Sequence, residues 1–419
     1  MELAPGKTKL QLFTPPKYSR DREYLASTAS LNIYGNPIEL VNVTEHVGVI
    51  RSPDGNLPHL LNRFSSHNKA IHSVLHAGLA RGHRGNPAAS LRVEKLYRVP
   101  VLLSGTASLL LKQSEYNALD SHFKSVLQNL LKLHDKTPDA VVYFLAGFLP
   151  ASALLHMRQL TLFGMICRLP QSILHRIARY IFIYVLVTSS NKSWSWFSHI
   201  RTLCSQYQLP HPLVLLDNPL TKSSFKSLVK SKVQDYWECK LRQSTLTLSS
   251  LSYFHPNFMS LSTPHPLLST CGSNSFEVSK SVIVSRIMSG RYRSDKLLKH
   301  FDKNHTGQCS LCTWECEGSI KHLLVSCPAL MQCRQQQFRM LEQENFSEKA
   351  KSIILSALNK SVPHFIQLLL DCSALPEVIS AVQSEGKQVI ENIFKFSRTY
   401  CFNVHMNRMK IIGRWTNYS

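Results

Sequence analysis

The segment "GQCSLCTWECEGSIKHLLVSCPAL", from Gly307 to Leu330, brings four cysteines and one histidine into a single short window. Cys309 and Cys312 form a C-x2-C pair, His322 follows after nine intervening residues, and Cys327 follows after four more. Two thiolates three positions apart on a tight turn can bind one metal ion, and a His and a Cys at the start of a helix can complete a tetrahedron around it. The spacing therefore predicts a zinc site with Cys309, Cys312, His322 and Cys327 as its ligands.

A set of three Cys and one His leaves no open coordination position for a reactive water molecule. We therefore expect the zinc to be structural, organising the fold rather than taking part in catalysis. Two further cysteines are set aside: Cys316 lies too near the first pair to close a well-shaped loop, and Cys333 lies beyond Pro328. The alternative is a segment that is rich in cysteine and binds no metal.

The charge of the chain limits the kind of partner it can have. Its 48 Lys and Arg outnumber 26 Asp and Glu and give a net charge of +22, while 44% hydrophobic residues indicate a mostly folded chain. The basic residues are spread over several segments, among them 51–98 and 280–303, rather than gathered in a tail. This distribution predicts charged faces on folded domains and an anionic partner, most commonly nucleic acid. The alternative is a generally basic surface without a specific partner.

Cysteine usage and hydropathy predict the compartment. The opening "MELAPGKTKLQLF" has no apolar core of the signal-peptide type, and the eleven cysteines are an odd number. We therefore expect an intracellular protein of the nucleus or cytoplasm that is not secreted. The apolar stretch 139–170 is interrupted by Pro150, His156 and Arg158, and "YIFIYVLV" is far shorter than the roughly 20 residues that span a bilayer. Both are predicted to be buried helices, and no membrane association is expected.

The periodicity of apolar residues predicts a mainly α fold. Residues 1–50 contain short alternating runs between turn signals and indicate a small amount of β structure. From Pro58 to about His134 apolar residues recur every three or four positions, and residues 136–245 continue as apolar helices that end in a Ser- and Lys-rich one. Residues 246–277 are rich in Ser, Thr and Pro, which predicts a loop and the clearest domain boundary. A helix over 278–303 and a helical C-terminal region are expected to follow.

The segment "SRIMSGRYRSDKLLKHF" directly precedes the cysteine cluster and combines cations with aromatic rings. Arg and Lys side chains can bind phosphates, and aromatic rings can stack on bases. The residues predicted to contact nucleic acid here are Arg286, Arg291, Tyr292, Arg293 and Lys296. The alternative is a solvated helix that places Tyr292 and Phe301 in the core.

Together with "CSLCTWECEGSIKHLLVSCPAL", this basic segment resembles the C-terminal region of the non-LTR (LINE-like) retrotransposon reverse transcriptase polyproteins. In that family a Gly-Arg-Tyr or Gly-Arg-His basic segment precedes a zinc knuckle with the order C-x2-C, Glu, His-Leu-Leu, Cys-Pro. The residues of this chain that stand at matching positions are Glu317, His322, Leu323, Leu324, Cys327, Pro328 and Arg334. The resemblance implies a CCHC zinc knuckle near residues 309–327.

The N-terminal half resembles the same family. "LAPGKTKLQLF" is similar to the palm strand that follows the catalytic aspartates, "TEHVGVIRS" to the primer-grip hairpin, and the helices from Leu57 onward to the thumb. The resemblance implies that Lys7 lies near the incoming nucleotide and that His46 and Gly48 lie on the primer grip. The nucleic-acid contacts expected on the thumb-like helices are Arg63 and Lys69.

The resemblance implies a division of the chain into six parts. These are the end of a palm with a primer-grip-like hairpin (1–55), a thumb-like helical domain (56–135), a helical linker region (136–245), the Ser/Thr/Pro-rich loop (246–277), a basic helix with the zinc knuckle (278–335) and a helical tail (336–419).

The catalytic part of the family is missing from this sequence. Polymerisation needs two metal ions held by carboxylates, which the family supplies from an upstream aspartate and a Tyr-x-Asp-Asp turn. The chain contains no Asp-Asp dipeptide and, by the resemblance, starts after that turn. We therefore expect no polymerase activity from the chain by itself, and no nuclease of the kind that follows the knuckle in some relatives.

The sequence thus predicts a nucleic-acid-binding protein that resembles the post-catalytic part of a retrotransposon reverse transcriptase. Its expected partners are RNA, single-stranded DNA and a template–primer duplex. Two alternatives remain at this point: a zinc-stabilised helical module for protein interaction, and a relic of a transposable element without a function.

Overall fold

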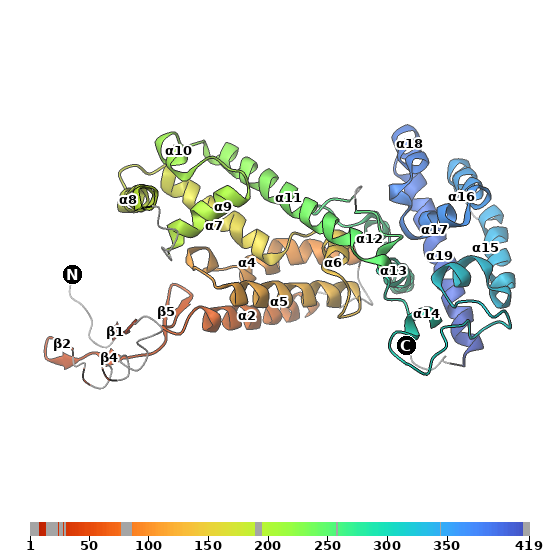
Figure 1. Ribbon diagram of the computed structural model, residues 1–419, viewed down its shortest axis with the longest axis horizontal. Helices are drawn as coiled ribbons and strands as arrows, with labels where there is room; N and C mark the ends of the chain where they lie inside the picture. Colours follow the sequence, from red (N-terminus) through yellow and green to blue (C-terminus); the bar gives the residue numbers. More distant parts are fainter. Residues whose placement is uncertain are drawn as a thin grey trace. The chain divides into compact units, whose positions relative to one another are not determined.

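The computed structural model describes residues 8–13, 24, 28, 31–76, 86–188, 195–256, 259–343 and 345–413, with residues 72–76 described by their backbone alone. The fold is mainly helical, as predicted (Figure 1). It divides into two compact units, each built from separate stretches of the chain. Unit 1 comprises Met1–Ser73, Lys95–His122 and Ala151–Val233, and unit 2 comprises Val74–Glu94, Phe123–Pro150 and Gln234–Ser419.

The strands of the described residues are short and lie near the N-terminus, which confirms the prediction of a small β component. One isolated antiparallel bridge also joins Gln308 and Glu317. Each strand pairs with one other strand. The pairs are β1 (Lys9–Leu10) parallel to β4 (Glu39–Leu40), β2 (Asn32–Ile33) antiparallel to β3 (Asn36–Pro37), and β5 (Thr44–His46) antiparallel to β6 (Val49–Arg51).

The hairpin β5–β6 lies where the resemblance of "TEHVGVIRS" implied a hairpin. Its register pairs His46 with Val49, so that Val47 and Gly48 form a two-residue turn. Both turn residues have a positive φ, 51° for Val47 and 74° for Gly48. This backbone suits the right-handed twist of a hairpin, but it strains a β-branched residue. Val47 is 86% exposed, so no side-chain packing offsets this strain.

Unit 1 is built from helices that carry one buried face each. The helices that lie in unit 1, wholly or in part, are α2 (Leu57–His76), α5 (Gln113–Leu131), α7 (Ala151–Cys167), α8 (Ile173–Thr188), α9 (Trp196–Gln206), α10 (Pro212–Asp217) and α11 (Lys222–Leu246). The short elements η3 (Glu94–Arg98), α4 (Val99–Leu102) and η4 (Thr106–Ser108) come between α2 and α5 in the sequence. The contact between α7 and α11 is especially close, because a Cβ on Gly164 would come within 2.3 Å of the Phe225 ring.

One helix of unit 1 keeps an apolar face in solvent. The exposed large apolar residues of α8 are Ile173, Leu174, Ile177, Tyr180, Ile183, Tyr184, Leu186 and Val187. Its opposite face carries the buried Ala178, Phe182 and Val185. The prediction that "YIFIYVLV" forms a buried helix is therefore wrong for one face of α8, because apolar composition does not tell which face a neighbouring helix covers.

Unit 2 is centred on its last helix. Its elements are α3 (Pro87–Val93), α6 (Asp139–Ala146), η5 (Ser249–Leu251), α12 (Pro266–Ser269), α13 (Ser275–Met288), α14 (Asp295–Leu298), η7 (His322–Ser326), η8 (Pro328–Leu330), α15 (Met331–Gln343), α16 (Glu348–Lys360), α17 (Val362–Asp371), η9 (Cys372–Ala374), α18 (Pro376–Glu385) and α19 (Gln388–Ile411). Helix α19 packs against α13, α15, α17 and α18. Residues 336–413 are therefore helical as predicted, but they form a core and not a tail.

The predicted boundary in residues 246–277 is not a boundary in the structure. This segment lies wholly within unit 2 and buries Leu251, Phe254 and Leu261. The backbone N–H of His265 donates to the carbonyl of Leu145 on α6 (3.0 Å). Composition misled the prediction, because the Ser and Thr residues of the segment are interleaved with apolar side chains that pack.

Within the described part of the chain, no single helix has the length and apolar character needed to cross a membrane. Two bent helix pairs meet the length and composition test together, α6 with α7 and the segment Val362–Ala374 with α18.

Candidate metal centre

A short hairpin presents the first two ligands of the predicted site. The backbone N–H of Cys309 donates to the carbonyl of Cys316 (2.9 Å), and the N–H of Gly318 donates to the carbonyl of Gly307 (2.9 Å). Gly307 has a φ of 81°, which a residue with a side chain rarely adopts. The chain between the two arms carries Cys312 at the turn. We call the segment Gly307–Cys327 the knuckle.

One helical turn presents the other two ligands. His322 begins η7 and Cys327 directly follows its last residue, and the N–H of Cys327 donates to the carbonyl of His322 (2.8 Å). The hydroxyl of Ser319 accepts from the N–H of His322 (3.3 Å) and fixes the start of the turn. The four-residue spacing of the sequence thus becomes a turn that directs both side chains to the same side.

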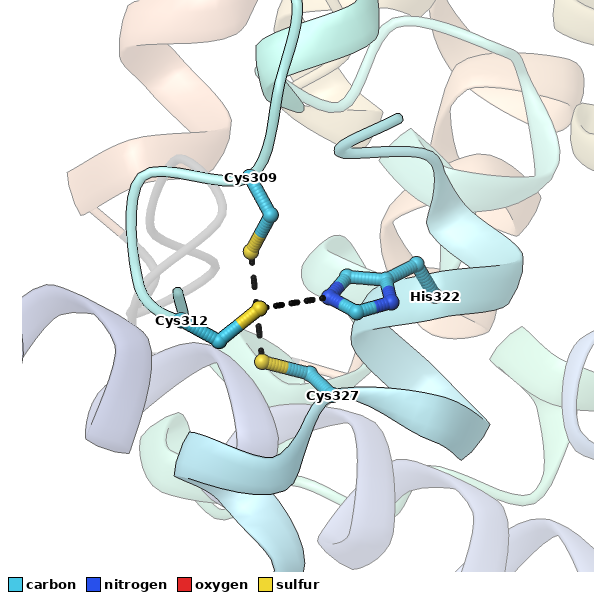
Figure 2. Close-up of side chains that lie close together, drawn as sticks. All are labelled: Cys309, Cys312, His322 and Cys327. Atoms are coloured by element: carbon cyan, nitrogen blue, oxygen red, sulfur yellow. Dashed lines mark hydrogen bonds between the residues drawn. The ribbon is translucent and has the colours of Figure 1, made fainter. Parts of the chain in front are cut away.

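The four side chains converge on one point (Figure 2). Their ligand atoms all lie within 4.8 Å of one another, with Cys309 Sγ 3.9 Å from Cys327 Sγ and Cys312 Sγ 3.5 Å from His322 Nε2. In a tetrahedron with zinc–sulfur bonds of about 2.3 Å and a zinc–nitrogen bond of about 2.0 Å, these two edges measure about 3.8 Å and about 3.5 Å. The predicted ligand set is therefore brought together, and its separations fit a tetrahedral metal ion.

The electrostatics of the cluster favour a bound cation. Burial raises the pKa of Cys309, and burial followed by the charge of Cys309 raises the pKa of Cys327 to about 12. Burial lowers the pKa of His322 and favours the neutral imidazole that can bind a metal. Thiolates that lie close together repel one another unless a bound cation compensates their charge. A metal ion at this position also deprotonates the thiols that coordinate it. The donor set therefore fits a divalent metal ion.

The two cysteines that were set aside have different surroundings. Cys316 Sγ lies 3.4 Å from His322 Nδ1 and 3.6 Å from His322 Nε2, so this thiol lies beside the four ligands. Cys333 instead accepts a hydrogen bond from Asn407 Nδ2 (3.2 Å) on α19. Cys333 is thus part of the helical packing, whereas Cys316 is a neighbour of the metal cluster that spacing arguments did not reveal.

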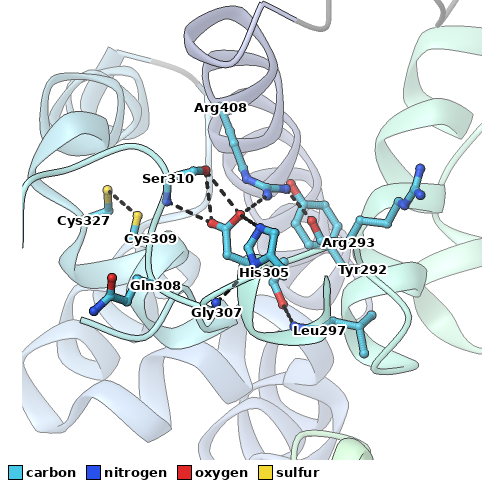
Figure 3. A network of polar contacts seen from close by, with 12 residues as sticks. Tyr292, Arg293, Leu297, His305, Gly307, Gln308, Cys309, Ser310, Cys327 and Arg408 are labelled. Carbon is cyan, nitrogen blue, oxygen red and sulfur yellow. Dashed lines mark hydrogen bonds and ion pairs between the residues drawn. The ribbon is translucent and has the colours of Figure 1, made fainter. Parts of the chain in front are cut away.

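A buried carboxylate joins the knuckle to α19. Asp295 is 2% exposed and accepts hydrogen bonds from the backbone N–H and the hydroxyl of Ser310. Arg408 Nη2 lies 3.4 Å and His305 Nε2 3.7 Å from the same carboxylate, and Figure 3 shows Ser310, His305 and Arg408 converging. Tyr400 adds a second link, because its hydroxyl donates to the carbonyl of Leu324 (2.7 Å). The helical region 336–413 therefore holds the knuckle in place.

The basic segment before the knuckle is only partly available to a ligand. Arg293 and Lys296 are exposed, and Lys296 Nζ lies 3.0 Å from a Glu317 carboxylate oxygen. Arg286 is half-buried and its Nε donates to the carbonyl of Lys132 (3.2 Å). Arg291 is also half-buried.

The prediction that Tyr292 stacks on bases does not agree with the structure. Its ring is 8% exposed, and its hydroxyl lies 2.8 Å from His405 Nδ1. The Arg408 guanidinium lies 5.6 Å from the centre of the same ring. Tyr292 is therefore part of the core of unit 2, as the alternative interpretation of this segment proposed. Phe301, which that interpretation also placed in the core, is 64% exposed.

The predicted contacts in the N-terminal half are divided between the hairpin β5–β6 and the helix α2. Lys7 lies outside the described residues. His46 is exposed on β5 and Gly48 forms the hairpin turn, while α2 carries the half-buried Arg63 and the exposed Lys69.

A nuclease-like pattern after the knuckle does not form a metal site. Pro376-Glu377 is followed by Glu385-Gly386-Lys387, an acidic-x-Lys element that the prediction of no nuclease overlooked. These residues belong to helix α18 and its end, and Glu377 binds His364 of α17 at 2.5 Å. Among the described residues, the group of His, Cys, Asp and Glu side chains that could hold a metal ion is the one in the knuckle.

Comparisons with known proteins find no matching family model, no similar curated protein and no similar solved structure. The geometry of the knuckle and the charge of its surroundings are therefore the observations on which a function is proposed.

Proposed function

We propose that the chain is a nucleic-acid-binding protein whose knuckle is held together by a structural zinc ion. The observation that carries the proposal is the convergence of Cys309, Cys312, His322 and Cys327 at separations that fit tetrahedral zinc. Three thiolates and one imidazole form a closed ligand set, so the zinc would stabilise the fold of the knuckle and perform no reaction.

The surface around the knuckle supports this proposal. Its exposed cations include Arg293, Lys299, Lys303 and Lys321. The rings available for stacking are Phe301 and Trp314, which are 64% and 56% exposed. Cations beside exposed aromatic rings are the combination that binds single-stranded nucleic acid without base readout. Phe301 and Trp314 thus take the role that sequence reasoning gave to Tyr292.

We further propose that the chain corresponds to the part of a non-LTR retrotransposon reverse transcriptase that follows the catalytic aspartates. The support is the order of motifs in the sequence, with a hairpin, helices, a basic segment and a CCHC knuckle. In this proposal the chain binds element RNA or a template–primer duplex and has no polymerase activity of its own.

The test compares the full chain with a variant that carries Cys309→Ser and Cys312→Ser. Both proteins are titrated with a single-stranded RNA of mixed sequence. We expect the variant to lose zinc and to bind the single strand at least about tenfold more weakly, because the exposed rings of the knuckle lose their fixed positions. Equal affinity of the two proteins would contradict a role for the knuckle in binding.

The second candidate, a helical module for protein interaction, is favoured by the apolar face of α8, where Tyr180 and Val187 are 69% and 78% exposed. Exposed apolar patches of this kind mark interaction surfaces or cause aggregation. The two candidates differ in their response to salt. Binding to nucleic acid that is undetectable at low salt would favour protein interaction.

A further inference from the structure

Helix α11 begins with a regular repeat of the dipeptide Lys-Ser, which lies outside the knuckle. The dipeptide Lys-Ser occurs at 222–223, 226–227 and 230–231. Positions four residues apart lie about 6 Å apart along a helix and are neighbours on its surface. Lys222, Lys226 and Lys230 therefore form a row of cations about 12 Å long. We call these three residues the lysine row.

The lysine row lies in solvent beside a buried stripe of the same helix. Lys222, Lys226 and Lys230 are all exposed. Phe225 and Val229, also four residues apart, are 3% and 1% exposed. The apolar stripe fixes the rotation of α11 in unit 1, and this rotation keeps the lysine row at the surface.

Almost all charges in the stretch Ala151–Val233, which contains the lysine row, are positive. Between Ala151 and Val233 the sequence has ten Lys and Arg residues and one acidic residue, Asp217. Arg179 already pairs with Asp217. Lys95, in another stretch of unit 1, is close enough that the charge of Lys230, after burial, contributes to lowering its pKa. The lysine row therefore belongs to a surface whose positive potential is not neutralised within its own stretch of chain.

The first residue of the row, Lys222, is placed unfavourably for the helix itself. Helix N-termini favour negative charge, yet the first turn of α11 contains no acidic residue and begins with Lys222. The cap at this end is the hydroxyl of Thr221, which accepts from the N–H of Ser224 (3.2 Å). Local stability does not explain cations at this end, whereas an anionic ligand would be favoured both by the helix dipole and by the lysines.

We propose that the lysine row binds the phosphate backbone of a nucleic acid. A nucleic-acid strand offers a regular line of phosphates, and each lysine ammonium group can neutralise one of them. The adjacent Ser223 and Ser227 are exposed and can donate hydrogen bonds to phosphate oxygens. Contacts of this kind add affinity and orient the strand without reading its sequence. The inference rests on the proposed function and adds to it a second binding surface, in unit 1.

The experiment measures how the affinity of the full chain for a DNA duplex depends on salt. Each phosphate contact contributes about 0.9 to the slope of log K against log salt concentration for a duplex. The triple variant Lys222→Gln, Lys226→Gln and Lys230→Gln is therefore expected to reduce the magnitude of the slope by about 2.7. Replacement of the same residues by arginine should leave the slope unchanged.

A second triple variant controls for net charge. Lys349→Gln, Lys360→Gln and Lys387→Gln removes the same charge from exposed positions in or beside α16 and α18 of unit 2. We expect this control to keep the slope of the wild-type protein. Thermal unfolding of both variants should match that of the wild type, because all six side chains are exposed.

The outcomes separate the inference from the proposed function. Equal slopes for the two triple variants would overturn the inference, while salt-dependent binding by the wild type would still support the proposed function. A wild-type protein that binds neither the DNA duplex nor single-stranded RNA in a salt-dependent way would overturn both. If the triple variant of the lysine row unfolds, the three single variants test the inference instead. Each of them is expected to lower the magnitude of the slope by about 0.9.

Discussion

At the residue scale, the ligand set makes a prediction about metal content. The variant Cys309→Ser with Cys312→Ser should contain no zinc, because two of the four converging ligands are lost. Cys316→Ser should keep one zinc ion per chain, although Cys316 Sγ lies 3.4 Å from His322 Nδ1. Elemental analysis of the purified proteins measures both. Loss of zinc from the Cys316→Ser variant would show that the ligand set is wrong.

A buried histidine predicts how stability depends on pH. Burial, followed by the charges of Arg408 and Arg286, lowers the pKa of His405 from 6.5 to about 4. Its contribution to stability is complete above about pH 6.5 and is lost as the pH falls toward 4, because the unfolded chain then binds the proton more readily. At pH 5 the loss is about 2 kcal/mol.

The variant His405→Gln isolates this contribution, because glutamine does not titrate. Urea unfolding at pH 7.5 and pH 5 gives the free energy of unfolding at each pH. We expect the wild type to lose about 2 kcal/mol more than the variant between these two values. Any loss of zinc at pH 5 lowers the free energy of unfolding of both proteins and cancels in the comparison between them. An identical loss in the two proteins would be evidence against the neutral, buried His405.

Residues were predictable where their roles depend on near neighbours in the sequence. The four ligands lie within 19 residues, so that their spacing already determines which side chains can meet. The burial of Tyr292 depends on His405 and Arg408, more than 110 residues further along the chain. Local spacing contains no information about that contact, and the stacking role given to Tyr292 failed for this reason.

At the scale of elements, the packing of segment 246–277 predicts the effect of one glycine. Gly147 ends α6 with a φ of 67°, and a Cβ there would lie 2.1 Å from the carbonyl carbon of Thr263. Gly147→Ala should therefore cost more than about 3 kcal/mol of stability, since backbone strain and a clash with backbone act together.

Gly272→Ala is the matched control, with a φ of 70° and no atom within 4 Å of the added Cβ. It should cost about 1–2 kcal/mol, the strain of the left-handed backbone alone. Chemical denaturation of the two variants provides the comparison. Equal losses of stability would mean that Thr263 does not pack against the end of α6.

Elements with a strong apolar period were predictable, and a segment of mixed composition was not. The periodic apolar residues before His134 correspond to α2 and α5, and the alternating run "TEHVGVI" corresponds to the hairpin β5–β6. In segment 246–277 the apolar side chains have no regular period, so that their burial depends on the surfaces that surround them. The Ser- and Thr-rich composition therefore suggested a linker where the structure has packed chain.

At the scale of the whole molecule, the order of parts along the chain did not predict the two compact units. Each unit is assembled from three stretches, and α2, α5 and α11 contribute residues to both. A linear division assigns one stretch to one domain, and for that reason the predicted thumb-like part 56–135 is shared between the units. The net charge of +22, in contrast, is a property of composition and was available from the sequence.

The central claim is that this charge and the knuckle serve to bind nucleic acid, and salt-titrated binding of the full chain to RNA tests it most directly. The predicted result is a straight line of log K against log salt concentration with a negative slope, similar for RNAs of unrelated sequence. Binding that is undetectable at low salt, or that does not change with salt, would contradict the claim.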